Sequence, residues 1–376
     1  MKFKLNKKDK TSNARTGTLY CDHGKIETPI FIPVGTQGSV KTLHQQELVK
    51  NVQAEIILSN TYHLFLRPGI EIFKKTGGIH KFINWDLPIL TDSGGYQVYS
   101  IAEKRKITDE GVEFQSHIDG SKHFFTPEKI IDIQLNIGAD FIMAFDECTP
   151  YPCEKSYAKK SMELTHDWLQ RCQTQYSKKN NIYGYQSNLI PIIQGSVYKD
   201  LRKISTKKIC SYDFKAVAIG GLSVGEPADI LYDMTNTCCE IIPEEKMRYL
   251  MGVGNPVNIL ECISLGIDMF DCVIPTRNGR NGLLYTPKGK INIKNKKWEY
   301  DFNPIDTLNY CSIDKNYSKA YLRHLFMSKE ILGMQIASFH NLSFYTWLIR
   351  EARKKINAGC FGEWKNKMSK ILNETI

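Results

Sequence analysis

Three aspartates of the sequence stand where short apolar runs end. Asp92 follows PILT, Asp146 follows FIMAF, and Asp271 follows MF. One such carboxylate could equally be a structural cap. Three that converge on one pocket would raise one another's pKa, and they could divide the roles of nucleophile, general acid or base, and hydrogen-bond partner of a ligand. Two carboxylates that flank a sugar carbon suit glycosyl transfer through a covalent intermediate.

Glycines follow several of the same runs. Gly94-Gly95, Gly220-Gly221 and Gly252-x-Gly254 follow the ends of these runs. Without side chains, their backbone amides and carbonyls can approach a flat ligand closely. Gln194, which ends a further run, offers a donor and an acceptor in one planar group. The sequence therefore places recognition groups beside the carboxylates.

The types of these residues suit a purine. Asp146, Gln194 and the backbone at Gly221 could together bind the edge of the base. Tyr96 and Met251 are apolar enough to cover its two faces, with ordinary core packing as the alternative. A positively charged surface beside such a site suggests that the sugar belongs to a nucleic acid.

The elements that must position these residues repeat eight times. Short apolar runs begin at Pro29, Glu55, Pro88, Asp140, Leu189, Ala216, Arg248 and Asp268. Such runs suit strands buried on both faces of a parallel sheet, and stretches of helical periodicity, such as 127–138 and 255–266, separate most of them. This alternation predicts an α/β fold, a closed (β/α)8 TIM barrel, with an open doubly wound sheet as the alternative.

A barrel explains why polar residues end nearly every run. The carboxyl ends of its strands open onto one face, where active sites lie. The residues expected to share that mouth are Asn60, Asp92, Asp146, Gln194, Gly221, Gly252 and Asp271. The single crevice of an open sheet needs fewer such residues, which favours the barrel.

Two segments depart from a minimal barrel. Between Tyr96 and Thr126 the alternating pattern GVEFQSHIDGSKHFFTP predicts a hairpin insertion. After Pro275 the barrel pattern ends, GLLYTPKGKINIKNKKW predicts another hairpin, and basic helical segments follow. The expected division is a single catalytic domain, 1–376, with N-terminal strands and barrel over 1–275 and an added C-terminal subdomain over 276–376.

Composition narrows the class of protein. The 376 residues are 42% hydrophobic and 24% charged, typical of a soluble globular chain, and we expect neither a membrane span nor a secretory signal. The net charge of +10 favours an anionic partner such as nucleic acid, although a general bias toward lysine could produce it. Eleven cysteines without a CxxC pair indicate reduced thiols, so we expect a cytoplasmic protein.

Five motifs, in order along the chain, are specific enough to indicate a family. They are TDSGGYQV from Thr91, MAFDECTP from Met143, IIQGSVYKDLR from Ile192, IGGLSVGEP from Ile219 and MFDCVIPTRNGRNG from Met269. Together they resemble the bacterial tRNA-guanine transglycosylases, also called queuine tRNA-ribosyltransferases, over nearly the whole chain. The family fold is a (β/α)8 barrel with an added C-terminal subdomain, which agrees with the pattern of runs.

The resemblance implies a role for each motif. Asp271 resembles the nucleophile that attacks the anomeric carbon of the ribose, and Asp92 resembles the general acid/base that deprotonates the incoming base. The implied substrate-binding residues are Ser93, Gly94, Gly95, Tyr96, Asp146, Gln194, Gly221, Leu222 and Met251. The implied RNA-binding residues are Gly252, Val253, Gly254, Asn255, Pro256, Val257, Asn258, Thr276, Arg277, Asn278, Gly279 and Arg280.

The implied activity is that of a pentosyltransferase of tRNA processing and queuosine biosynthesis. It replaces guanine at the wobble position of tRNAs with a GUN anticodon, those for aspartate, asparagine, histidine and tyrosine, with 7-aminomethyl-7-deazaguanine (PreQ1). The target base must leave its stack to enter the pocket, and lysines and arginines would contact phosphates. Cys148 and Val224 match the bacterial form and not the form that uses queuine. The family generally forms homodimers, so we expect one here.

The chain departs from the family at a metal site. Most members hold zinc with three cysteines and a histidine, and the corresponding residues here are Asn309, Cys311, Asp314 and His340. Only Cys311 and His340 remain good ligands, as remnants of the site, because an amide and a carboxylate replace two thiolates. We therefore expect no metal cofactor, with packing and hydrogen bonds holding this lobe together.

Two smaller departures from the family lie near the motifs. Ser196 stands where a second glycine usually follows Gln194, and Asn281 stands where histidine is common. Neither change removes a catalytic group, although Asn281 could alter how the RNA-reading segment sits.

Two other classes of function remain as alternatives. A non-catalytic RNA-binding paralogue would have no need of Asp92 and Asp271, which are both present. A glycoside hydrolase would use the same carboxylates on a polysaccharide, but the basic charge and the presence of only five tryptophans, on which sugar rings stack, argue against it.

Overall fold

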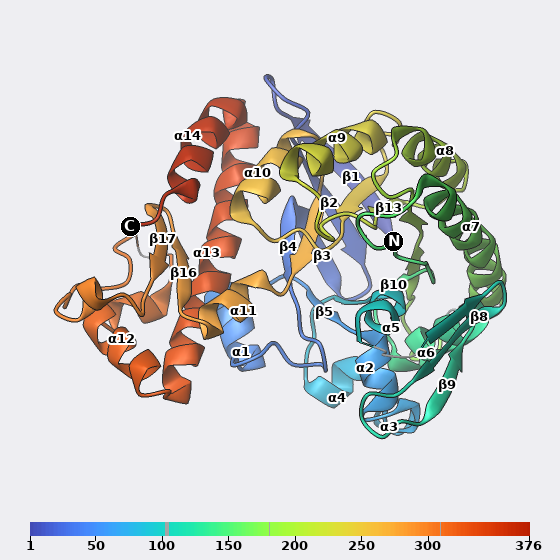
Figure 1. Ribbon diagram of the computed structural model, residues 1–376, viewed down its shortest axis with the longest axis horizontal. Helices are drawn as coiled ribbons and strands as arrows, with labels where there is room; N and C mark the ends of the chain where they lie inside the picture. Colours follow the sequence, from blue (N-terminus) through green and yellow to red (C-terminus); the bar gives the residue numbers. More distant parts are fainter. Residues whose placement is uncertain (102–104, 180, 309) are drawn as a thin grey trace.

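The computed structural model describes residues 1–101, 105–179, 181–308 and 310–376. Parallel strands form its centre, with helices around them and a second lobe beside them (Figure 1). The parallel strands are β4 (Ile30–Pro33), β5 (Ile57–Ser59), β6 (Ile89–Thr91), β10 (Phe141–Met143), β11 (Asn188–Ile190), β12 (Ile192–Ile193), β13 (Ala216–Ile219), β14 (Met247–Leu250) and β15 (Met269–Cys272). They form a four-stranded sheet of order β11-β10-β6-β5 and a five-stranded sheet of order β12-β13-β14-β15-β4.

Each of the eight predicted apolar runs contains at least one strand. The run that begins at Leu189 contains two, because Pro191 separates β11 from β12. The predicted α/β fold with parallel strands is therefore confirmed, as two sheets. The edges of the two sheets also approach each other at β4 and β5. Val34 and Leu58 form a parallel bridge, and the Gly35 N–H donates to the Leu58 carbonyl at 2.6 Å.

Both faces of the strands are buried, which explains why the runs are continuously apolar. In β4, Ile30 and Ile32 pack with Leu90, Met269 and other strand residues in one core cluster. Phe31, between them, points the opposite way and packs against Tyr345, with ring centroids 4.8 Å apart. The period-2 alternation of the strand thus supplies two separate cores.

Helices occupy most of the segments between the strands. They are α1 (Gln45–Glu47), α2 (Thr61–Leu66), α3 (Ile70–Thr76), α4 (Ile79–Ile83), α5 (Gly95–Ile101), α6 (Pro127–Ile137), α7 (Lys155–Lys178), α8 (Lys199–Cys210), α9 (Ala228–Cys239) and α10 (Pro256–Ser264), with a π-helical turn at Leu48–Val52. Local sequence explains where α10 begins. The Asn255 side chain caps the helix by accepting a hydrogen bond from the Val257 N–H at 2.9 Å, and Pro256 suits the first turn of a helix.

Antiparallel strands are added to this framework. One sheet contains β1 (Lys2–Lys8), β2 (Arg15–Cys21) and β3 (Gly24–Thr28), another contains β7 (Arg105–Thr108), β8 (Gly111–Gln115) and β9 (Lys122–Phe125), and a third contains β16 (Leu283–Thr286) and β17 (Gly289–Asn292). The hairpin expected between Tyr96 and Thr126 is β8–β9, with β7 as a third strand. The hairpin expected after Pro275 is β16–β17.

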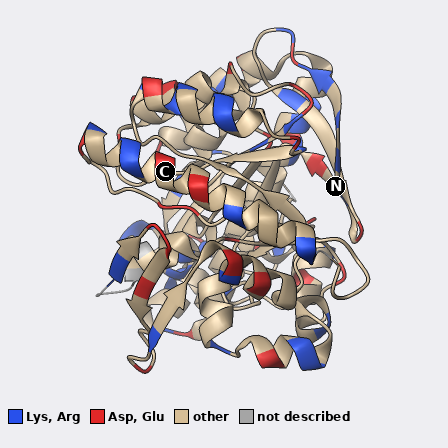
Figure 2. Cartoon of the chain, turned by 90° about the vertical axis from the view of Figure 1, so that its right-hand side faces the viewer, with Lys and Arg blue, Asp and Glu red and all other residues tan. Residues whose placement is uncertain are grey.

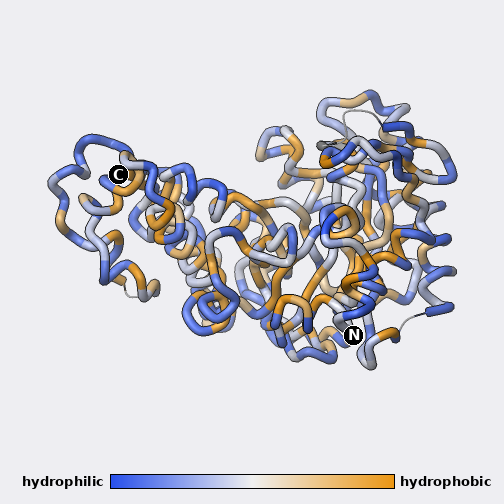
Figure 3. Tube along the Cα trace, turned by 90° about the horizontal axis from the view of Figure 1, so that it is seen from below, coloured by the Kyte–Doolittle hydropathy of each residue, from blue (hydrophilic) through white to orange (hydrophobic). Residues whose placement is uncertain are grey.

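The C-terminal lobe lies to one side of the strands (Figures 1 and 3). Its helices are α11 (Ile274–Arg280), α12 (Lys319–Met327), α13 (Ile331–Ala358) and α14 (Phe361–Asn373), with 3-10 turns at Lys296–Trp298 and Ser312–Lys315. The long helix α13 contacts α11 and β16 as well as β2 and β4, so it connects the lobe to the strands. Within the described ranges, no helix has the length and apolar character needed to cross a membrane.

Candidate active site

A cavity of about 380 Å³ opens at the carboxyl ends of the parallel strands. Its lining includes all three aspartates singled out from the sequence, Asp92, Asp146 and Asp271. Of the other residues expected at the mouth, the lining also includes Asn60, Gly221 and Gly252. Gln194 lies behind the wall and bonds to Asp146. The fold thus brings together Asn60 and Asp271, which are 211 residues apart in the sequence.

Asp92 lies at the end of β6 and is nearly buried. Its carboxylate accepts hydrogen bonds from Asn60 Nδ2 at 2.5 Å and from the Thr61 N–H at 2.8 Å. Burial raises the pKa of Asp92 to about 6; these two bonds oppose the shift, and the nearby charge of Asp271 adds to it. A carboxyl group with this pKa can exchange protons near neutral pH, as a general acid or base must.

Asp271 lies within β15 and faces the cavity. Its Oδ1 accepts hydrogen bonds from the Tyr249 hydroxyl at 2.6 Å and from the Gly252 N–H at 3.0 Å. Burial raises the pKa of Asp271, and the hydrogen bonds from Tyr249 and Gly252 oppose that rise by stabilising the charged form. Two donors on one oxygen therefore fix the orientation of the carboxylate.

Asp146 is held between two neighbouring strand ends. Ser93 Oγ donates to Asp146 Oδ1 at 2.8 Å, and Gln194 Nε2 donates to Asp146 Oδ2 at 2.7 Å. Burial raises the pKa of Asp146, and both bonds oppose that rise. Gly95 is required here, because a Cβ at that position would lie 2.5 Å from the Asp146 carbonyl oxygen.

The walls of the cavity carry the remaining predicted recognition residues. Tyr96, about half exposed, and Met251 both contribute to the lining, as do Leu222 and the pair Cys148 and Val224. Gly94 is buried behind the wall and is not part of the lining.

The first segment expected to contact RNA, 252–258, lies beside the cavity, but few of its residues are accessible. Gly252 and Asn255 are exposed, whereas Val253 is fully buried. Gly254, also buried, accepts a hydrogen bond at its carbonyl from Tyr345 at 2.5 Å. Pro256 is buried at the start of α10, and Val257 and Asn258 are partly buried. This segment offers a ligand mainly its backbone and the exposed end at Asn255.

The second segment, Thr276–Arg280, lies in α11. Arg277 is exposed and lines the cavity. Thr276 and Gly279 are buried, and a Cβ at Gly279 would lie 2.9 Å from the backbone of α13. Asn278 Nδ2 donates to the Tyr285 hydroxyl at 2.7 Å, and Asn281 Nδ2 donates to the Arg277 carbonyl at 2.9 Å. Packing on α13 therefore fixes the helix that presents Arg277.

The family zinc position does not hold a typical zinc ligand set. Cys311, Asp314 and His340 are buried together, and Asn309 lies outside the described residues. His340 Nδ1 bonds to Asp314 Oδ1 at 2.8 Å, and His340 Nε2 bonds to the Tyr285 carbonyl at 2.9 Å. Both ring nitrogens thus have protein partners, and one thiolate is fewer than structural zinc sites use. This donor set therefore departs from those of typical structural zinc sites.

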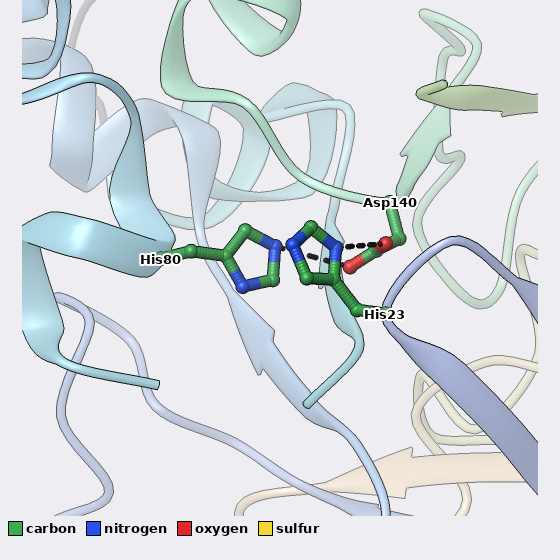
Figure 4. A group of neighbouring side chains, drawn as sticks. All are labelled: His23, His80 and Asp140. Atoms are coloured by element: carbon green, nitrogen blue, oxygen red, sulfur yellow. Dashed lines mark hydrogen bonds and ion pairs between the residues drawn. The ribbon is translucent and has the colours of Figure 1, made fainter. Parts of the chain in front are cut away.

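A second cluster of metal-ligand types lies at the opposite ends of the strands (Figure 4). Asp140 contacts His23 Nδ1 at 2.7 Å and His80 Nε2 at 3.1 Å, and the two imidazole rings stack with centroids 3.8 Å apart. Burial alone would raise the pKa of Asp140, but the bonds from both histidines lower it to about 2. This arrangement ties the turn after β2 and helix α4 to the start of β10, which is a structural role.

Two contacts of the site were not predicted from the sequence. Tyr249 lies inside an apolar run, and nothing in the run distinguishes it from a core aromatic residue. Asn60 was expected at the mouth, but its bond to Asp92 was not. Chain neighbours cannot reveal either contact, because each joins two different strands.

Comparison with known proteins gives a consistent result. Residues 9–374 match the family model described as queuine tRNA-ribosyltransferase. Proteins with that name from Desulforamulus reducens and Aquifex aeolicus are each 49% identical to the chain, over 373 and 375 residues, covering 99% and 97% of both sequences. One from Thermoanaerobacter sp. is 50% identical over 370 residues, covering 98% of this chain and 97% of its own.

Proposed function

Because the chain belongs to the queuine tRNA-ribosyltransferase family, we propose that it is a tRNA-guanine transglycosylase of queuosine biosynthesis. The observation that carries the proposal is the convergence of Asp92, Asp146 and Asp271 on one cavity. One carboxylate is oriented by two donors, one has a pKa near neutrality, and one belongs to a polar network suited to a base. These are the parts that glycosyl exchange requires.

In the first half-reaction, an oxygen of Asp271 attacks the anomeric carbon of the ribose. The bond from this carbon to guanine breaks, and the base leaves with the electron pair and takes a proton from Asp92. In the second half-reaction, Asp92 removes a proton from the incoming base, whose nitrogen attacks the same carbon and releases the Asp271 carboxylate. The pKa of about 6 allows Asp92 to act in both directions.

The base would lie against the opposite wall. Asp146, with Gln194 behind it, and the backbone at Gly221 and Leu222 would bind its polar edge. Ser93, Gly94 and Gly95 would hold that wall in place, and Tyr96 and Met251 would cover the faces of the ring. Cys148 and Val224 line the cavity, and their match to the bacterial form supports 7-aminomethyl-7-deazaguanine as the incoming base.

The macromolecular substrate would be tRNA with a GUN anticodon. Arg277, Gly252 and Asn255 are exposed at the cavity and would contact the bases and backbone beside the wobble position. The net charge of +10 supports phosphate contacts, although Figure 2 shows lysines and arginines interspersed with acidic residues on the face it presents.

The proposed architecture is a closed barrel with an added C-terminal subdomain. A closed (β/α)8 barrel over 1–275 is supported by the Val34–Leu58 bridge at one junction of the sheets and by the continuity of β11 and β12 at the other. Residues 276–376 would form the RNA-reading subdomain. A cytoplasmic location agrees with the free thiols of all eleven cysteines.

A homodimer is a further part of the proposal. The C-terminal lobe exposes the aromatic side chains of Tyr300 and Phe302, at 78% and 76%, and Tyr321 is partly exposed as well. Large apolar side chains in contact with water favour burial by a second copy. Light scattering at micromolar concentration would give twice the mass of 43.2 kDa for the dimer.

The C-terminal lobe would need no zinc, since the donor set departs from those of typical structural zinc sites. Elemental analysis of purified protein should find zinc well below one atom per chain, and a chelator should leave the melting temperature unchanged. Stoichiometric zinc that the chelator removes with loss of stability would contradict this part of the proposal.

The experiment that tests the function is incorporation of labelled guanine into an unmodified GUN tRNA. Wild type should incorporate the label, Asp271→Asn should not, and Asp213→Asn, which changes an exposed carboxylate, should match wild type. Tight tRNA binding without incorporation by wild type would favour the non-catalytic paralogue. Full incorporation by Asp271→Asn would exclude Asp271 as the nucleophile.

A further inference from the structure

Arg202 is a fully buried arginine whose guanidinium bonds only to backbone carbonyls. It lies in α8, and its hydrogen bonds run from Nε to Ser196 at 2.7 Å, from Nη1 to Ile193 at 3.1 Å and to Gly220 at 2.7 Å, and from Nη2 to Gly221 at 3.1 Å. Within the described ranges no carboxylate forms a salt bridge with it. A buried cation without a charged partner is strongly disfavoured, so its position requires a structural reason.

The four carbonyls belong to the ends of two adjacent strands. Ile193 is the last residue of β12, and Ser196 follows it on the other side of Gln194; Gly220 and Gly221 follow β13. These strand ends are the ones that supply Gln194 and the Gly221 backbone to the base-binding wall. The planar guanidinium, with five donors in a fixed fork, can span both at once, which an ammonium group cannot.

The bonds to Gly220 and Gly221 also fix where the following amides point. Both peptide bonds are trans, so each N–H points away from the carbonyl of the same peptide group. Since Arg202 binds these carbonyls from behind, the N–H groups of Gly221 and Leu222 are directed to the other side. Both residues line the cavity. Two donors are thereby aimed at the place where the edge of a base would lie.

The backbone that carries Gln194, after β12, is fixed in a similar way. Ser205, one turn further along α8, accepts a hydrogen bond at Oγ from the Gln194 N–H at 3.2 Å. Ser196 has a φ of 50°, in the left-handed region, and its carbonyl is bound by Arg202. Gly195 must lack a side chain, because a Cβ there would lie 2.9 Å from the backbone nitrogen of Arg202 in α8. The face of α8 that packs against the strands therefore holds Gln194 with polar side chains, although apolar side chains are usual on such a face.

We propose that Arg202 is a positioning residue for base recognition, which aims the Gly221 and Leu222 amides at the purine and holds in place the backbone on either side of Gln194, whose side chain supports Asp146. The inference rests on the proposed function. As guanine leaves, the electron pair of the broken bond increases the negative charge on its carbonyl oxygen, and oriented N–H donors stabilise that charge. The same donors bind the polar edge of the base before it reacts, so loss of Arg202 should also weaken binding of the base, much more than binding of tRNA.

The test compares Arg202→Met and Arg202→Lys with Arg248→Met in the labelled-guanine exchange assay. Arg248 is the matched control, because it is also buried and bonds to the Ile242 and Gly266 carbonyls, away from the cavity. For Arg202→Met we expect the KM for guanine to rise about tenfold or more, with the KM for tRNA changed less than about twofold. Arg202→Lys should lie between Arg202→Met and wild type, and Arg248→Met should keep both KM values.

Equal changes in both KM values, or an unchanged KM for guanine in Arg202→Met, would overturn the inference. Should Arg202→Met fail to fold, calorimetric titration of guanine into wild type and Arg202→Lys decides the question, because a weaker affinity of Arg202→Lys supports the role and an equal affinity refutes it. A wild type that binds guanine without incorporating it would refute the proposed function alone.

Discussion

The Tyr249 hydroxyl donates a hydrogen bond of 2.6 Å to Asp271 Oδ1, the same oxygen that accepts from the Gly252 N–H. Tyr249 is fully buried, so this donor cannot easily turn to water. With both donors on Oδ1, the other oxygen of the carboxylate is the one available to attack a sugar carbon. In the proposed mechanism, the pair therefore sets the direction from which Asp271 attacks.

Tyr249→Phe tests that relationship. The substitution removes one hydrogen bond to a charged group and leaves the ring in place. We expect the exchange rate constant at saturating tRNA and guanine to fall about tenfold at neutral pH, since the carboxylate keeps only the Gly252 N–H. Tyr232→Phe, which also removes a tyrosine hydroxyl, bonded to Asn258 at 2.8 Å, serves as a control and should lose less. Equal losses in both variants would argue against a role for Tyr249 in orientation.

The pH dependence of exchange should report on Asp92. Its pKa of about 6 predicts two limbs. The rate falls on the acid side, because the protonated carboxyl group cannot accept the proton of the incoming base, and it falls on the alkaline side, because the carboxylate cannot protonate the departing guanine. Asn60→Ala removes a hydrogen bond that stabilises the carboxylate, so the pKa of Asp92 should rise and the acid limb should move to higher pH. An acid limb that stays in place, or moves to lower pH, would show that another group controls it.

Asp92 should also lower the stability of the fold at neutral pH. Its pKa is about 6 in the folded protein and 3.8 ordinarily, so between these values the folded state retains a proton that the unfolded state has released. Stability from this group is therefore lost as the pH rises from about 4 to 6. The amide side chain that Asp92→Asn introduces does not titrate in this pH range.

The free energy of unfolding of Asp92→Asn, relative to wild type, should accordingly increase between pH 4 and pH 7 by up to about 3 kcal/mol. Denaturant titrations of both proteins at several pH values would measure it. A difference that is constant across this range would mean that Asp92 has no raised pKa in the folded protein.

The positions of the aspartates were predictable because the signal is local. An apolar run that ends on a carboxylate identifies both a buried strand and the group at its end, as PILTD does for Asp92. Parallel strands then gather those ends on one side, whatever the details of the helices between them. The α/β class and the shared cavity follow from this rule.

Contacts between strands were not predictable in the same way. Tyr249 and Asp271 belong to different strands, and the register that aligns them is set by backbone pairing of Tyr249 with Met269. Arg202 is the last residue of the motif IIQGSVYKDLR, and only the packing of α8 against two strand ends reveals its partners. N-terminal strands were expected, but their pairing as a separate sheet was not, because β1 is a highly charged strand on the surface.

Ser196 offers a last test, because it occupies a position that usually suits glycine. Its φ of 50° lies in the left-handed region, which costs a residue with a Cβ about 1–2 kcal/mol. Ser196→Gly removes that strain, and the greater freedom of glycine in the unfolded chain offsets part of the gain, so the free energy of unfolding should rise by up to about 1 kcal/mol. The KM for guanine should stay unchanged, since Arg202 binds the backbone carbonyl and not the serine side chain.

The matched control is Ser211→Gly at the end of helix α8, where φ is −70° and glycine relieves no strain, so stability should fall. Denaturant titrations of the two variants would give shifts of opposite sign, and a loss in both would show that the weak contact of Cys153 with Ser196 outweighs the backbone strain.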